Sequence, residues 1–344
     1  MSVTRDDVAR LAGVSSATVS YVVNNGPRPV SEETRKKVQK AIEILGYQPS
    51  SIARSLKTKR TTTIGLVVSD ILNPVLSGIA KGIEDAILER GWNMILCNSD
   101  EDPERELRFL KMLVSKQADG IILQPTGGNM DFLNLLVNNR KKPVVLLDRQ
   151  LDELDVDCVL FENEEGAYQA TRHLIDIGHK RIALVSLPRH LTPGFERVAG
   201  YMRAHEEAGI PVDPALITEG SFKADTQDIK EALFESENPP TALMACSNRL
   251  CASFLRYAKE HNIRIPQDVA LAVFDDVSHY SYITPSITAV AVDIDEFGQE
   301  AGQLLIDRIN CGEEPCEPNV VRLPCTLMVR ESTSQYSHER VASG

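Results

Sequence analysis

The sequence predicts a mixed α/β protein with two unlike parts: an N-terminal all-α domain and a larger, two-lobed core of doubly wound parallel sheets. The first 48 residues contain short helical patterns that begin and end with capping residues. From residue 61 onwards, continuous apolar stretches alternate with amphipathic helical patterns, as in parallel sheets covered by helices on both faces. Because roughly 280 residues exceed the usual size of one such unit, we expect two lobes.

The first helix is expected to begin after Thr4. Its hydroxyl can accept a hydrogen bond from the backbone of Asp7, whose carboxylate can reach back and complete a capping box. Gly13 is placed to end the helix in the left-handed conformation. The buried side should hold the apolar residues at helical spacing, which are Val8, Leu11 and Ala12.

Two further helices complete a small bundle. Ser15 is the expected cap of the second and Ser31 of the third, which ends at Gly46. The inward-facing residues are expected to be Val19, Val22 and Val23, then Val38, Ala41, Ile42 and Leu45. Two helices joined by a tight turn and closed by a third form a helix-turn-helix module, whose second helix lies in the DNA major groove. The outward residues of that helix are small and polar, which favours DNA reading over a plain bundle: Ser16, Ala17, Ser20 and Tyr21.

Charge is distributed unevenly along the chain. Residues 1–60 contain 11 Lys and Arg against 5 Asp and Glu, a net charge of +6, whereas the whole chain carries −12. The rest of the chain therefore carries −18. A basic N-terminal region on an acidic body indicates a protein that contacts nucleic acid with one end only.

Eight apolar strands are predicted in the core, at residues 64–68, 93–98, 120–124, 144–148, 158–163, 182–186, 242–247 and 269–275. Helical patterns between them include 76–90, 104–116, 166–177 and 197–208. Ligands of open parallel sheets bind beyond the carboxyl ends of the strands, so polar residues at those ends are candidates for a binding site. They are Asp148, Arg149, Asn248, Arg249 and Asp275, with Arg197 expected just before a helix and Phe222 just after a short strand.

The N-terminal segments RDDVARLAGVSSATVSYVVN and VSEETRKKVQKAIEILGYQPSSIARSLK resemble the LacI/GalR family of bacterial transcription regulators, and the resemblance extends through nearly the whole chain. It implies that Ser16, Ala17 and Tyr21 contact bases. The family often has arginine where Tyr21 stands, and without a guanidinium the bidentate contact to guanine is lost. It also implies that phosphates are held by Thr4, Thr18, Ser20 and Asn24. A hinge helix starting at Pro49 would place Arg54, Leu56 and Lys57 in the minor groove, with Leu56 inserted between base steps.

For the core, the resemblance implies two lobes like those of periplasmic binding proteins, facing one another across a cleft. The expected divisions are a helix-turn-helix domain at 1–48, a hinge at 49–60, an effector-binding core at 61–331 and a polar tail at 332–344. Within the core, the first lobe takes about 61–161 and 292–322, and the second takes about 162–291 and 323–331. The positions that commonly line the family's effector site match Asp148, Arg197, Phe222, Asn248 and Asp275.

Two effector classes remain open from the sequence. Relatives that respond to sugars often carry aromatic residues after Asn73-Pro74, where this chain has Val75-Leu76, so a stacking plate for a sugar ring is missing. Three arginines, Arg149, Arg197 and Arg249, suit an anionic ligand such as a sugar acid or sugar phosphate. The alternative is that Arg149 and Arg249 form salt bridges with acids such as Asp276 or Glu162, and that the ligand is neutral.

These features predict a ligand-responsive transcription regulator, a repressor of a carbohydrate uptake or catabolic operon, that binds a pseudo-palindromic operator as a homodimer. The seven cysteines and seven histidines show no metal-binding spacing, and no catalytic motif is present, so we expect no cofactor and no enzymatic activity. We expect a cytoplasmic protein without signal peptide or membrane span. The alternatives are a regulator controlled by a partner protein, a solute-binding protein or an enzyme. The last 14 residues lack a leucine heptad, which favours a dimer over a tetramer.

Overall fold

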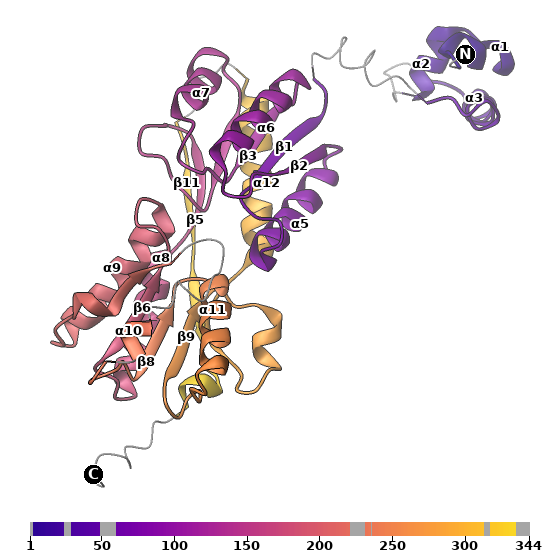
Figure 1. The fold of residues 1–344 in the computed structure, drawn as a ribbon. Coiled ribbons are helices and arrows are strands. Elements are labelled where there is room, and N and C mark those ends of the chain that lie inside the picture. Colours follow the sequence, from indigo (N-terminus) through magenta and orange to yellow (C-terminus); the bar gives the residue numbers. More distant parts are fainter. Residues whose placement is uncertain are drawn as a thin grey trace. The chain divides into compact units, whose positions relative to one another are not determined.

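The computed structural model describes residues 3–23, 29–48, 60–220, 231–234, 236–312 and 317–334. The chain divides into two compact units, Met1–Thr62 and Thr63–Gly344, which we call the head and the core. Their elements are shown in Figure 1. Each unit has its own apolar interior, so we describe them separately.

The head contains three capped helices: α1 (Arg5–Ala12), α2 (Ser16–Val23) and α3 (Glu32–Leu45). The predicted capping box of α1 is present, because the Thr4 hydroxyl accepts from the Asp7 backbone while the Asp7 carboxylate accepts from the Thr4 backbone. Gly13 and Gly46 end their helices with φ of 66° and 60°, the left-handed region that glycine occupies without steric cost.

The interior of the head is built from one valine of each helix, Val8, Val19 and Val38, all completely buried. The prediction that Leu11 faces this interior is wrong, since its side chain is 51% exposed. Ala9 is buried instead. The buried face of α1 therefore contains Val8, Ala9 and the partly buried Ala12, whereas Leu11 lies on the side that faces solvent.

The core contains two six-stranded sheets. The first has the order β11-β5-β4-β3-β1-β2 and the second β12-β10-β9-β8-β6-β7. All strand pairs of the first are parallel, whereas the edge strand β12 of the second runs antiparallel to β10. The strands of the first sheet are β1 (Thr63–Val68), β2 (Asn93–Asn98), β3 (Gly120–Leu123), β4 (Val144–Leu147), β5 (Asp157–Phe161) and β11 (Val320–Leu323). Those of the second are β6 (Ile182–Ser186), β7 (Ile217–Glu219), β8 (Ala242–Ala245), β9 (Ala270–Phe274), β10 (Thr288–Val292) and β12 (Cys325–Met328).

Helices cover both faces of each sheet. The residues of β1 alternate between two clusters: Ile64 and Leu66 pack with α5 and α12, whereas Val67 packs with α6 and α7. This double covering explains the continuous apolar strands. The helices of the core are α5 (Pro74–Leu88), α6 (Pro103–Ser115), α7 (Met130–Asn134), α8 (Asn163–Asp176), α9 (Thr192–Glu207), α10 (Glu231–Phe234), α11 (Asn248–Glu260) and α12 (Ile294–Cys311). Short helical turns lie at Leu135–Asn139, Pro214–Leu216, Ser278–Ser281 and Glu331–Thr333.

The two sheets share one strand order, because β1, β2, β3, β4, β5 and β11 of the first correspond to β6, β7, β8, β9, β10 and β12 of the second, although the last pair differs in direction. In each sheet the strand order reverses between the first and third strands, β1 and β3 or β6 and β8. The crevice beyond the carboxyl ends at such a reversal is where doubly wound sheets bind ligands. The chain passes between the sheets three times, after β5, β10 and β11, and β5 and β11 run side by side in Figure 1.

Candidate functional site

The N-terminal half of α2 is the candidate DNA-reading surface of the head. Ala17 is exposed there and Ser16 is half-buried, as is Tyr21 one turn further along the helix. The Ser16 hydroxyl already donates a hydrogen bond to Oδ1 of Asp6 at 2.5 Å, so α1 and α2 are joined at this surface. A base contact by Ser16 would therefore use an acceptor lone pair of its oxygen or exchange Asp6 for the base edge.

The residues predicted to hold phosphates are partly engaged within the head. The Thr4 hydroxyl donates to Asp7 Oδ2 at 2.6 Å, and the Thr18 hydroxyl lies 2.9 Å from that of Ser15. Ser20 is half-buried on the same helix as Thr18. The remaining predicted DNA contacts lie outside the described residues; they are Asn24, Arg54, Leu56 and Lys57.

A second candidate site is a cavity of about 800 Å³ in the core, where the carboxyl ends of both sheets meet. This volume lies within the range of small-molecule binding sites. Six of the seven predicted effector residues line it, namely Asp148, Arg149, Arg197, Asn248, Arg249 and Asp275. The seventh, Phe222, lies outside the described residues.

Two aspartates stand at equivalent points of the two lobes. Asp148 follows β4, and Asp275 follows β9, the corresponding strand of the second sheet. Both have a left-handed backbone, with φ of 60° and 77°, a conformation that aspartate tolerates better than most residues. The common topology therefore places one carboxylate from each lobe on the wall of the same cavity.

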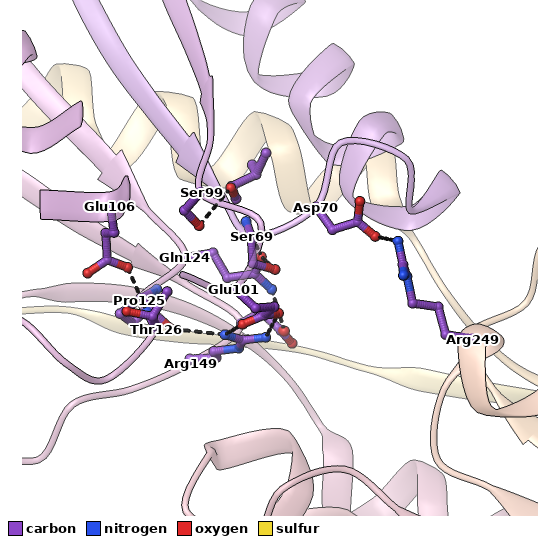
Figure 2. A network of polar contacts seen from close by, with 12 residues as sticks. Ser69, Asp70, Ser99, Glu101, Glu106, Gln124, Pro125, Thr126, Arg149 and Arg249 are labelled. Atoms are coloured by element: carbon purple, nitrogen blue, oxygen red, sulfur yellow. Dashed lines mark hydrogen bonds and ion pairs between the residues drawn. The ribbon is translucent and has the colours of Figure 1, made fainter. Parts of the chain in front are cut away.

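Asp148 is oriented by a neutral network in the first lobe, of which Figure 2 labels Ser69 and Gln124. Oε1 of Gln124 accepts from the backbone and the hydroxyl of Ser69, at 3.1 and 2.8 Å. The Gln124 amide nitrogen must then point the other way, and it donates to Asp148 Oδ2 at 3.0 Å. The second oxygen, Oδ1, is buried and has no hydrogen-bond partner among the described residues.

Arg149, the residue after Asp148, is held by Glu101 and Pro125. Its guanidinium donates to both carboxylate oxygens of Glu101, at 2.6 and 2.8 Å, and to the Pro125 carbonyl at 3.0 Å. Only 3% of Arg149 is exposed. A fork that is already bidentate to a carboxylate has little capacity left for an anionic ligand.

Arg197 is held in the second lobe from several directions. Nε donates to Asn163 Oδ1 at 2.9 Å, and Nη1 donates to the Cys246 carbonyl at 2.6 Å. The guanidinium lies 3.6 Å from the centre of the Phe274 ring, and Nη2 is 3.8 Å from Asp275 Oδ1. Burial raises the pKa of Asp275, and Arg197 opposes that rise. The expectation that Arg197 precedes a helix is wrong, because α9 begins at Thr192 with Pro193 in its first turn.

The start of α11 contacts the first lobe across the cavity. Arg249 forms an ion pair with Asp70, which follows β1 (Figure 2). Beside it, Asn248 Nδ2 donates to Asn73 Oδ1, the cap of α5, at 2.9 Å. Oδ1 of Asn248 is buried without a hydrogen-bond partner among the described residues. Arg149 and Arg249 thus pair with Glu101 and Asp70, and not with the predicted acids, since Asp276 pairs with Arg330.

One buried acid supports the wall of the cavity without lining it. Glu106 of α6 has no exposed surface, and its carboxylate accepts from the Thr126 backbone and the Asn129 amide, both at 2.7 Å. Burial raises the pKa of Glu106, and these hydrogen bonds oppose the rise. Glu106 therefore fixes the segment after β3 that carries Thr126 to the cavity.

Several cavity residues were missed from the sequence, among them Ser69, Asp70, Glu101, Gln124 and Thr126. The signal that could have found most of them is position, because Ser69 and Asp70 directly follow β1 and Gln124 directly follows β3. In the described parts of the chain, no group of three His, Cys, Asp or Glu side chains is arranged to hold a metal ion. No helix there is long and apolar enough to span a membrane.

Comparison with known proteins identifies the class that this fold and these sites define. Residues 4–50 match the family of bacterial regulatory proteins of the lacI type, and residues 61–331 match the periplasmic binding proteins and sugar-binding domain of the LacI family. The chain belongs to the LacI family. The predicted fold class and family are confirmed, and the protein is a ligand-responsive, DNA-binding transcription regulator and not an enzyme.

Three individual proteins illustrate the likeness. The probable HTH-type transcriptional regulator EndR of Paenibacillus polymyxa is 35% identical over 337 residues, which cover 96% of this chain and 98% of EndR. The structure of the transcriptional regulator CelR in complex with cellobiose is similar, with 33% identity, a TM-score of 0.71 and coverage of 96% and 99%. The Lac repressor dimer bound to operator and the anti-inducer ONPF shows 25% identity, a TM-score of 0.80 and coverage of 97% and 99%.

Proposed function

We propose that this regulator is a repressor of a carbohydrate uptake or catabolic operon, and that its cavity binds a hydroxyl-rich small molecule, a sugar or sugar derivative. The observation that carries the proposal is the pair of buried acceptors on the cavity wall, Oδ1 of Asp148 and of Asn248. Buried acceptors without partners are costly, and hydroxyl groups of a ligand would satisfy them. The CelR complex with cellobiose supports a carbohydrate ligand.

The geometry favours a non-anionic ligand. Arg149 and Arg249 are each paired with a carboxylate, and Arg197 is committed to Asn163, to the Cys246 carbonyl and to the Phe274 ring. An anion would have to break one of these interactions and would then face the acids of the cavity. The residues that we propose to contact the effector are Asp148, Arg197, Phe222, Asn248, Arg249 and Asp275. Arg149 is proposed to act indirectly, by holding Glu101 on the cavity wall.

On the DNA side, we propose that two heads of a homodimer read a pseudo-palindromic operator. Base contacts are assigned to Ser16, Ala17 and Tyr21, and phosphate contacts to Thr4, Thr18, Ser20 and Asn24. Minor-groove contacts are assigned to Arg54, Leu56 and Lys57. The Lac repressor dimer bound to operator supports this arrangement. We also propose that the helix-turn-helix domain ends at residue 48, that the hinge ends at residue 60, and that the two lobes take the predicted ranges. The proposed site of action is the cytoplasm, where chromosomal DNA is accessible.

Selection from a random duplex library with the full-length protein tests the DNA part of the proposal. The expected result is an enriched site with inverted repeats. Ala17→Glu should abolish its binding, because a carboxylate on α2 repels the phosphates. Ala215→Glu adds the same charge at an exposed position of the core and should bind like the wild type. Equal binding by the Ala17→Glu variant would show that α2 does not read DNA.

The ligand part is tested by adding neutral sugars to the protein on its selected site. A sugar that binds the cavity should change the DNA affinity, and the direction of the change shows whether the ligand releases the repressor or strengthens its binding. A sugar series that neither stabilises the protein against heat nor changes DNA affinity would contradict the assignment of a hydroxyl-rich ligand.

A further inference from the structure

The cavity carries more negative than positive side chains. Among the described residues that line it, six are carboxylates and three are guanidiniums. The carboxylates are Asp70, Asp100, Glu101, Asp148, Glu219 and Asp275. Each arginine takes one of them: Arg149 pairs with Glu101, Arg249 with Asp70, and Arg197 lies 3.8 Å from Asp275.

The three remaining acids differ in what surrounds them. Asp100 pairs with Arg105 at 3.0 Å, and its side chain is 64% exposed. Glu219 is exposed and accepts from the Arg189 backbone at 3.3 Å. Asp148 is the exception, because the one hydrogen-bonding partner of its carboxylate in the described parts of the chain is the neutral amide of Gln124.

The arrangement around Asp148 places a negative charge toward the cavity. Arg149, the next residue, donates its guanidinium hydrogen bonds to Glu101 and to the Pro125 carbonyl. Gln124 cannot turn to offer a second donor, because Ser69 holds its oxygen. In the other lobe, the equivalent Asp275 has Arg197 beside it and accepts from the Asn248 backbone. The two lobes thus present equivalent carboxylates, and a guanidinium compensates only the one in the second lobe.

We propose that the effector is a hydroxylated molecule that also carries a protonated amino group, as an amino sugar does, and that this ammonium group binds Asp148 Oδ1. The proposal rests on the proposed function, because it names the class of ligand for the same cavity. An ammonium supplies several donors and no acceptor, which suits the unpartnered oxygens of Asp148 and Asn248. A hydrogen bond between two ionised groups is roughly twice as strong as a neutral one. A neutral hydroxyl would fill the same space but leave the charge of Asp148 uncompensated.

Isothermal titration of the full-length protein with matched pairs of sugars tests the proposal. The pairs are glucosamine with glucose, galactosamine with galactose, and mannosamine with mannose. We expect at least one amino sugar to bind about tenfold or more tightly than its neutral partner, because the ammonium adds the Coulomb attraction of an ion pair to a hydrogen bond that a hydroxyl could also donate. That preference should shrink as the pH rises through the pKa of the amine.

The substitution Asp148→Asn tests whether Asp148 causes the preference for the amino sugar. An asparagine oxygen can keep the hydrogen bond from Gln124, while its amide then points a donor into the cavity, so the preference for the amino sugar should disappear. Glu104→Gln removes one charge from an exposed position of α6 outside the cavity and should retain the preference. Thermal unfolding without ligand verifies that both variants fold.

The outcomes separate this proposal from the one on which it rests. Neutral sugars that bind as tightly as their amino partners in every pair would overturn the amine while leaving a hydroxylated effector in place. A preference that survives Asp148→Asn would also overturn it. If no member of any pair binds, both the amine and the hydroxyl-rich ligand are contradicted.

Discussion

Glu106 shows how a single buried acid positions part of the cavity. Its two carboxylate oxygens accept from two different donors, Thr126 N–H and the Asn129 amide. In Glu106→Gln, one oxygen becomes an NH₂ group and faces a donor, so one hydrogen bond is lost and a buried N–H is left unsatisfied. We expect a loss of about 1–3 kcal/mol in the free energy of unfolding, measured with urea. Glu104→Gln, on the exposed side of the same helix, should change it by less than about 0.5 kcal/mol.

His205 is a second residue with a measurable consequence. It is 1% exposed, and its Nδ1–H donates to the Tyr201 carbonyl at 3.0 Å. Burial lowers the pKa of His205 below its ordinary value of 6.5. Below pH 6.5 the imidazole of His205 takes up a proton in the unfolded chain but not in the folded chain. The free energy of unfolding that neutral His205 contributes is therefore fully present above pH 6.5 and is lost as the pH falls toward the lower pKa of the folded state.

The matching experiment compares urea unfolding of the wild type and His205→Phe between about pH 7.5 and pH 5. Phenylalanine keeps a ring beside Tyr201 but does not titrate. The free energy of unfolding of the wild type should therefore fall more steeply with decreasing pH than that of the variant. Burial also lowers the pKa of His173, but this residue is present in both proteins, so its effect cancels in the comparison. Parallel pH dependences would contradict a lowered pKa for His205.

The sequence predicted which residues line the cavity more accurately than it predicted which residues pair with one another there. Asp148 and Asp275 could be found because a polar residue directly after an apolar strand is a local signal, and Asn248 because it begins the helix that follows β8. The pairing of Arg249 with Asp70 has no such signal, since the two residues are far apart in sequence and meet only when the lobes assemble. The anionic ligand suggested by three arginines lost its support for this reason.

At the scale of elements, β6 was predicted well because both of its faces are buried, and the apolar run at 182–186 coincides with it. The apolar run at 93–98 coincides with β2, an edge strand that is only partly buried. Helix starts were less well predicted: α9 begins five residues before Arg197, because Pro193 suits the first turn of a helix. The antiparallel β12 was also missed. Its four residues alternate between buried and more exposed positions, and its pairing with β10 depends on the chain returning to the second sheet.

The contact between α8 and α9 yields a prediction about packing. A Cβ atom at Gly200 of α9 would collide with the carbonyl of Glu164 and lie 2.8 Å from the backbone nitrogen of Tyr168, both in α8. Gly200→Ala should therefore destabilise the core by about 1–3 kcal/mol, since overpacking in a tight contact forces backbone shifts. The intrinsic helix propensity of alanine acts in the opposite direction, by about 1 kcal/mol.

Gly302 of α12 provides the matched control for Gly200. It is also a helical glycine, but its nearest neighbour would be a side-chain atom, Ala86 Cβ, at 3.1 Å. Gly302→Ala should change the unfolding midpoint much less than Gly200→Ala when both are compared by thermal denaturation. Equal midpoints would show that α8 and α9 separate without cost and that the close backbone approach is unimportant.

At the scale of the whole molecule, the head and the core have opposite charge and separate interiors. The apolar cluster of the head contains residues from the head alone, and both clusters of the core contain residues from the core alone. The basic head suits DNA, whereas the acidic core, with its cavity between two lobes of one topology, suits a small ligand. This division of labour implies that the two functions can be separated physically.

A chain that starts at Thr61 tests that separation. Because its apolar clusters are complete without the head, it should fold, unfold at nearly the same temperature as the core of the full-length protein, and bind the same ligand with the same affinity. It should have no measurable affinity for the operator.

The full-length protein should lose roughly a thousandfold or more in operator affinity between about 50 and 200 mM salt, because binding releases the counterions of several phosphates. Operator binding by the core alone, or a full-length affinity that is insensitive to salt, would contradict the assignment of DNA binding to the basic head.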